Sequence, residues 1–239
     1  MAEKIVQKIE KEIYPDISTF ELYQIVRDLL EKEKKEVSMK FNLKQAMKRL
    51  GPEGFVFEKF IREILEKLGY KAINNQMLRG ACIEHEIDFI AENKKKKYIG
   101  ECKFRNRIGE RVDVNVPMKM FAMMDDLIAG KIGPKGKLKP IIVTNEKFTE
   151  KSIKYAKCKK IDLLGWSYPM GKSLENIIDE HSFYPLTVLP SFSDSHLKIF
   201  SEEGILLLED LKKADYSLFR KHISLKHFNQ LKKEASLIV

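Results

Sequence analysis

Residues 84–91 read EHEIDFIA, residues 93–97 form the basic tract NKKKK, and residues 98–104 read YIGECKF. These two runs predict antiparallel strands joined by a turn within the lysine tract. Opposite residues then have numbers that add to 189, so Asp88 faces Glu101 and Glu86 faces Lys103. Because side chains alternate along a strand, these four share one face, whereas His85 is expected to point away from it. The other face is apolar and suits a core (Ile87, Phe89, Cys102 and Phe104).

The shared face carries the chemistry of a hydrolytic site. Two carboxylates with Cβ atoms roughly 5 Å apart repel each other, so Asp88 and Glu101 need a compensating charge. Carboxylate oxygens suit magnesium, which takes further ligands from water and a substrate phosphate. Lys103 can reach the phosphate or the attacking water, and together these groups predict phosphodiester hydrolysis. On alternation alone, a hairpin whose outer face is merely solvated remains the simpler interpretation.

The sequence on either side of the hairpin predicts alternating helices and strands. An apolar stripe from Phe57 to Leu68 indicates a helix that ends at Gly69, followed by a strand at residues 70–74. Beyond the hairpin we expect a helix over residues 116–128, a buried strand over 138–144, a helix over 150–157 and a strand over 161–164. This order predicts an α/β fold with an α/β/α sandwich core.

Helical patterns flank this core on both sides. Ser18 and Glu21 form a capping-box pattern before one N-terminal helix, and apolar spacing predicts another from Val37 to Leu50. The linker Gly51-Pro52-Glu53-Gly54 marks a boundary, and short helices return after Lys172. We therefore predict a helical module at residues 1–51, the α/β core at 52–170 and a helical tail at 171–239.

Composition narrows the class of protein and its partners. The formal net charge is +9, and residues 92–160 contain 19 Lys and Arg against 8 Asp and Glu, so the basic charge lies in the middle of the chain. Such a surface attracts polyanions, with nucleic acid as the leading partner, although an ordinary lysine-rich surface explains the charge alone equally well. The three cysteines have no CxxC spacing, which favours a reducing cytoplasm over disulfides or structural zinc. The charged N-terminus predicts neither a signal peptide nor a membrane span.

Residues from Phe57 to about Trp166 resemble Mrr-like restriction endonucleases of the PD-(D/E)xK superfamily. The resemblance covers nearly half the chain and rests on Phe57-Glu58, Gly69-Tyr70, Ile87-Asp88, Glu101-Cys102-Lys103, and a later stretch that includes Val143-Thr144-Asn145, Phe148, Ala156 and Leu163-Leu164. It implies a restriction-endonuclease-like core, metal binding by Asp88 and Glu101, and a catalytic role for Lys103. Glu58 matches a helical acid near the metal in related enzymes. The implied activity is a DNA endonuclease of restriction or genome-maintenance type that uses Mg²⁺ or Mn²⁺, with a homodimer as an open option.

The flanking modules carry weaker resemblances and keep two alternatives open. Residues 15–51 resemble the later helices of an ATP cone without its phosphate-holding beginning, so we do not expect ATP as a cofactor unless the natural chain begins upstream. Residues 196–211 resemble a helix-hairpin-helix unit, but Glu202 and Glu203 before Gly204 would repel phosphate. The alternatives are a catalytically silent nucleic-acid-binding module of the same fold and an ATP-regulated nuclease.

Overall fold

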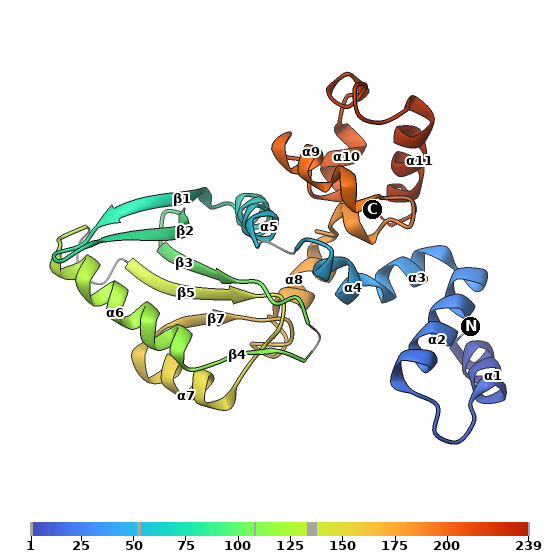
Figure 1. Ribbon diagram of the computed structural model, residues 1–239, viewed down its shortest axis with the longest axis horizontal. Helices are drawn as coiled ribbons and strands as arrows, with labels where there is room; N and C mark the ends of the chain where they lie inside the picture. Colours follow the sequence, from blue (N-terminus) through green and yellow to red (C-terminus); the bar gives the residue numbers. More distant parts are fainter. Residues whose placement is uncertain (1, 52–53, 108, 133–137, 239) are drawn as a thin grey trace.

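A computed structural model describes residues 2–51, 54–107, 109–132 and 138–238 and has a five-stranded sheet at its centre (Figure 1). The strand order is β1-β2-β3-β5-β7, in which β1, β2 and β3 are antiparallel neighbours and β3, β5 and β7 run parallel. The strands are β1 (Lys71–Arg79), β2 (Glu84–Glu92), β3 (Lys97–Lys103), β5 (Leu138–Thr144) and β7 (Asp162–Leu164). A separate two-stranded sheet pairs β4 (Arg111–Val112) with β6 (Lys147–Phe148).

Helices cover both faces of the large sheet (Figure 1). On one face, α5 (Phe55–Lys67) buries Phe57 and Phe60 in the same apolar core as Phe89 of β2. On the other, α6 (Asn115–Ala129) and α7 (Glu150–Lys159) enclose a second core, in which Leu127 packs with Ile99 of β3. The predicted α/β/α sandwich is therefore confirmed.

The N-terminal helices are α1 (Ala2–Glu12), α2 (Thr19–Glu33), α3 (Lys35–Phe41) and α4 (Leu43–Lys48). The predicted capping box is present, because Ser18 accepts a hydrogen bond from the amide of Glu21 and the Glu21 carboxylate accepts one from the amide of Ser18. The single helix predicted from Val37 to Leu50 is wrong, since the chain turns at Asn42. Asn42 has φ of −79° and ψ of 0°, which departs from the helical conformation, and its side chain accepts a hydrogen bond from the Tyr23 hydroxyl at 2.5 Å.

The C-terminal part consists of short helices joined by tight turns. They are α8 (Leu174–His181), η1 (Leu186–Val188), η2 (Asp194–His196), α9 (Leu197–Glu202), α10 (Leu208–Lys213), η3 (Tyr216–Leu218) and α11 (Leu225–Ala235). Gly204 separates α9 from α10 with φ of 67°, a left-handed conformation that suits glycine. None of the helices in the described ranges is long and apolar enough to cross a membrane.

One apolar core continues across the predicted module boundaries. Met47 of α4, Phe60 of α5 and Phe200 of α9 belong to a single cluster of buried side chains. Of the predicted linker at residues 51–54, Pro52 and Glu53 lie outside the described residues. The division at residues 51 and 170 stays a prediction, but the helices on either side pack against the sheet domain and bring side chains close to it.

Candidate active site

The register of the central hairpin agrees with the sequence for four pairs of residues. Phe89 pairs with Gly100 and Glu92 with Lys97, so opposite residue numbers add to 189. Gly100 is required here, because a Cβ atom would stand 2.1 Å from Cζ of the Phe89 ring. The β2–β3 ladder ends at the pair Phe89–Gly100. The prediction that Asp88 and Glu101 are cross-strand partners is therefore wrong. Instead, Asp88 Oδ2 accepts a hydrogen bond from the amide of Cys102 at 2.6 Å.

The pairing of β2 with its other neighbour, β1, is interrupted by a kink at Asp88. Asn75 of β1 lies across from Asp88, between the pairs Asn74–Phe89 and Gln76–Ile87, and has φ of 52°. Asparagine tolerates this left-handed conformation better than most residues. The kink changes the alternation, since Ile87 packs in the core under α6 whereas Phe89 packs in the core under α5. The expectation that Ile87 and Phe89 share a face is therefore wrong.

Asp88, Glu101 and Lys103 nevertheless line one cleft. This open cleft has a volume of about 790 Å³ and lies between the kinked hairpin and α6. Glu101 and Lys103 come from the end of β3, where they alternate with buried Cys102. Further lining residues come from the turn before β2, from β2 itself and from α6, among them Cys82, Glu84, His85, Glu86, Lys119, Asp125 and Asp126.

Burial and neighbouring charges set the protonation states of Asp88 and Lys103. Burial, and next the carboxylate of Glu101, raise the pKa of Asp88 to about 6, while the hydrogen bond from the amide of Cys102 opposes the rise. Burial also lowers the pKa of Lys103, but the hydrogen bond and charge of Glu101 outweigh this and hold it above its ordinary value. Lys103 Nζ and Glu101 Oε1 form an ion pair. At neutral pH Lys103 is therefore a cation.

Glu58 stands close enough to interact with this cluster from the first turn of α5. Burial raises the pKa of Glu58 to about 7, and the carboxylates of Asp88, Glu101 and Glu86 contribute in that order. Asn74 connects the two elements, because its Nδ2 donates to the carbonyl oxygens of Glu58 at 3.2 Å and of Asp88 at 3.0 Å. The sequence did not reveal Asn74, since a single amide in an edge strand carries no periodic signal.

The donor set fits a divalent cation. Three carboxylates with mutual repulsion, two of them with raised pKa values, need a positive charge beyond that of Lys103. Within the described ranges no three His, Cys, Asp or Glu side chains are grouped tightly enough to hold a metal by themselves. Magnesium does not require such a cage, because one or two carboxylates with water and substrate phosphate complete its shell.

His85 lies in the same cleft, contrary to its expected position away from Asp88. Its Nε2 is 2.7 Å from Oδ2 of Asp126 on α6, and Asp126 Oδ1 accepts a hydrogen bond from the amide of Cys82 at 2.8 Å. The His85 contact and then the Cys82 amide hold the pKa of Asp126 well below its ordinary value. Asp126 thus fixes the turn that precedes β2. The kink at Asp88 explains why simple alternation failed for His85.

A mixed sheet between helices, with two acids and a lysine in one cleft at the end of its hairpin, defines the class of restriction-endonuclease-like proteins. Residues 50–166 match the family model Mrr_cat, described as restriction endonuclease. A curated relative, an uncharacterized protein of Archaeoglobus fulgidus, is 36% identical over 126 residues, which cover 53% of this chain and 69% of the relative. The chain belongs to this restriction endonuclease family.

A solved structure supports the fold over a larger part of the chain. The crystal structure of a protein of unknown function, AF1548, is similar with a TM-score of 0.66 and 30% sequence identity. The match covers 76% of this chain and 96% of that protein. The likeness therefore reaches beyond the 117 residues from 50 to 166 that match the family.

Proposed function

We propose that this protein is a metal-dependent endonuclease that hydrolyses phosphodiester bonds in DNA, in restriction or genome maintenance. The observation that carries the proposal is the cleft that gathers Asp88, Glu101 and Lys103 in a chain of the restriction endonuclease family. A binding module alone needs no such set of two acids and a lysine. The basic middle of the chain adds attraction for a polyanion.

Asp88 and Glu101 are the proposed ligands of Mg²⁺ or Mn²⁺, with Glu58 as a further acid beside them. When bound, the cation supplies Lewis-acid chemistry that polarises the scissile phosphate and acidifies water. The Cys102 amide holds one oxygen of Asp88, which leaves the other oxygen for a ligand in the cleft. Asn74 fixes the backbones that carry Glu58 and Asp88, so the acids keep their separation.

Lys103 has the proposed role of stabilising negative charge on the phosphate as the bond breaks. Its raised pKa keeps the ammonium group charged, which suits an electrostatic role better than that of a general base. Lys119 of α6 lines the same cleft and offers a second cation to the DNA backbone. All three cysteines are free thiols, so the proposed chemistry involves no disulfide.

The test is a cleavage time course on supercoiled plasmid with Mg²⁺, Mn²⁺ or a chelator. Lys103→Ala should lose nicking and linearisation while DNA binding is retained. The matched control is Lys97→Ala, because Lys97 lies at the other end of β3 beside Glu92. Equal cleavage by the native chain and Lys103→Ala would show that the site is misassigned. Binding without cleavage by the native chain under every condition would favour the silent module.

A further inference from the structure

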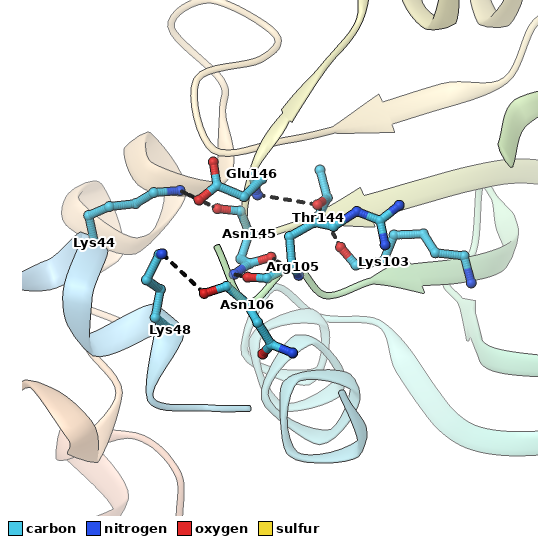
Figure 2. Close-up of polar contacts among 8 residues, drawn as sticks. All are labelled: Lys44, Lys48, Lys103, Arg105, Asn106, Thr144, Asn145 and Glu146. Atoms are coloured by element: carbon cyan, nitrogen blue, oxygen red, sulfur yellow. Dashed lines mark hydrogen bonds and ion pairs between the residues drawn. The ribbon is translucent and has the colours of Figure 1, made fainter. Parts of the chain in front are cut away.

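Lys44 of α4 reaches from the N-terminal helices into the sheet domain (Figure 2). Its ammonium group lies 4.6 Å from the centre of the Trp166 ring and 2.9 Å from Oε1 of Glu146, and it donates to the carbonyl oxygen of Asn145. The Glu146 side chain is only 4% exposed and that of Lys44 25%. Lys44 thus forms an ion pair with a buried carboxylate that lies about a hundred residues further along the chain.

Glu146 ends a buried polar segment that begins at Thr144, the last residue of β5. Thr144, Asn145 and Glu146 are 0%, 0% and 3% exposed, which is unusual for three consecutive polar residues. The Glu146 amide donates to Thr144 Oγ1 at 3.2 Å, and the Glu146 carbonyl accepts from the amide of Trp166 at 2.9 Å. This segment is therefore held internally, and Lys44 supplies the charge that its carboxylate needs.

The same segment holds the end of the strand that carries Lys103. Thr144 Oγ1 donates to the carbonyl oxygen of Lys103 at 2.6 Å. The Asn145 side chain accepts from the amide of Arg105 at 2.8 Å and donates to its carbonyl at 2.9 Å (Figure 2). The backbone N–H and C=O of Arg105 are thus both held by the side-chain amide of Asn145. The backbone carbonyl of Lys103 is held by the hydroxyl of Thr144.

We propose that Lys44 is a positioning residue for Lys103, acting through Glu146, Asn145 and Thr144. The proposal rests on the proposed function of Lys103. It makes α4, which precedes the residues 50–166 that match the family, a structural part of the active site. Lys48, one turn further along α4, adds a bond to the carbonyl oxygen of Asn106 at 3.2 Å, on the loop that leaves β3.

The physical reason is the cost of stranding a buried charge. Among the residues that the structure describes, Lys44 is the ion-pair partner of the buried Glu146 carboxylate. Without Lys44 that charge is left unpaired, so the segment must open or shift to reach water. Such a shift loosens the bonds from Thr144 and Asn145 to the end of β3. Catalytic groups tolerate little displacement, since a shift of about 1 Å can cost about a hundredfold in rate.

The experiment is hydrogen exchange of the full-length chain, with the Arg105 amide as the main probe and the amides of α6 as an internal reference. Lys44→Met should raise exchange at Arg105 about tenfold through local opening and leave α6 unchanged. Lys44→Arg keeps the charge and should restore protection. Lys32→Met is the matched control, because Lys32 is an exposed lysine of α2. It should behave as the native chain.

Single-turnover cleavage provides the functional readout. Lys44→Met should lower the rate constant about tenfold or more with DNA affinity within about twofold of native, since only the geometry of Lys103 changes. The double variant Lys44→Met/Glu146→Gln leaves no stranded charge, so protection at Arg105 should return towards the native level. If Lys44→Met does not fold, a folded double variant with near-native protection supports the same reason, and a double variant that stays unfolded or exchanges fast at Arg105 overturns it.

Two results distinguish a failure of the positioning role of Lys44 from a failure of the proposed nuclease function. Native-like exchange at Arg105 in a folded Lys44→Met chain overturns the positioning role, whatever the cleavage rates are. Raised exchange in a chain that never cleaves DNA, even as the native protein, supports the connection from Lys44 to β3 and overturns the proposed function instead.

Discussion

Replacing Asp88 by asparagine should stabilise the metal-free protein at pH 8 while it abolishes cleavage. The introduced side-chain amide would keep an oxygen that accepts from the backbone amide of Cys102, so the fold around the kink is preserved. What the change removes is a carboxylate that burial and Glu101 make costly to ionise. A gain in stability with a loss of activity is typical of a residue kept for function.

The magnitude follows from the pKa of Asp88, which rises from 3.8 to about 6 in the folded chain. Two units at about 1.4 kcal/mol each correspond to about 3 kcal/mol, and the partial exposure of Asp88 to water reduces this to about 1 to 2 kcal/mol. Well below pH 3.8 the carboxyl group is protonated in both states and costs nothing. Between pH 4 and pH 6 the unfolded chain releases the proton first, so native stability falls as pH rises.

The assay is urea denaturation of the native chain and Asp88→Asn at pH 4 and pH 8, with chelator present. The difference between the two free energies of unfolding should be about 1 to 2 kcal/mol more favourable to the variant at pH 8 than at pH 4. Asp113→Asn serves as the matched control, since Asp113 is exposed and should show no such change. A difference that does not vary with pH, or that favours the native chain at pH 8, would contradict the raised pKa of Asp88.

Three further predictions address the site and its support. Mg²⁺ should raise the free energy of unfolding by about 1 to 3 kcal/mol when it is roughly ten- to a hundredfold above its dissociation constant, and this gain, measured by urea denaturation, should vanish in Glu101→Gln. Gly100→Ala should cost about 1 to 3 kcal/mol in the same assay, because its Cβ would overlap the Phe89 ring; a neutral effect would contradict the packing. Burial, and then Asp210, raises the pKa of Glu63 to about 8, so native stability should fall as pH rises from about 5 to 8. Glu63→Gln should therefore have the same melting temperature as the native chain at pH 4 and a higher one at pH 9, and equal melting temperatures at pH 9 would contradict the raised pKa of Glu63.

The sequence predicts the sheet domain well, because its signals are periodic and local. The strand expected at residues 138–144 is β5 with the same bounds, and the hairpin register depends only on the length of the turn. The edge strand was predicted too short, as residues 70–74, whereas β1 runs from Lys71 to Arg79. Asn74, Asn75 and Gln76 resemble a loop in composition, but they belong to an edge strand with one exposed face.

The supporting residues of the site were not predictable in the same way. The kink at Asp88 brings His85 into the cleft, and it depends on a left-handed Asn75 in the neighbouring strand. Lys44 meets Glu146 across 102 positions of sequence, through a helix that resembles any other amphipathic segment. Such contacts are specified by tertiary packing, which periodicity along one segment does not encode.

We expect DNA to be hydrolysed in the cleft that holds Asp88, Glu101 and Lys103. The most direct test is the single-turnover cleavage rate of an end-labelled duplex as a function of Mg²⁺ concentration, for the native chain and Glu101→Gln. The rate should saturate with Mg²⁺ for the native chain and be at least about a hundredfold lower for Glu101→Gln, with DNA affinity within about threefold. A Glu101→Gln chain that cleaves at the native rate would contradict this expectation.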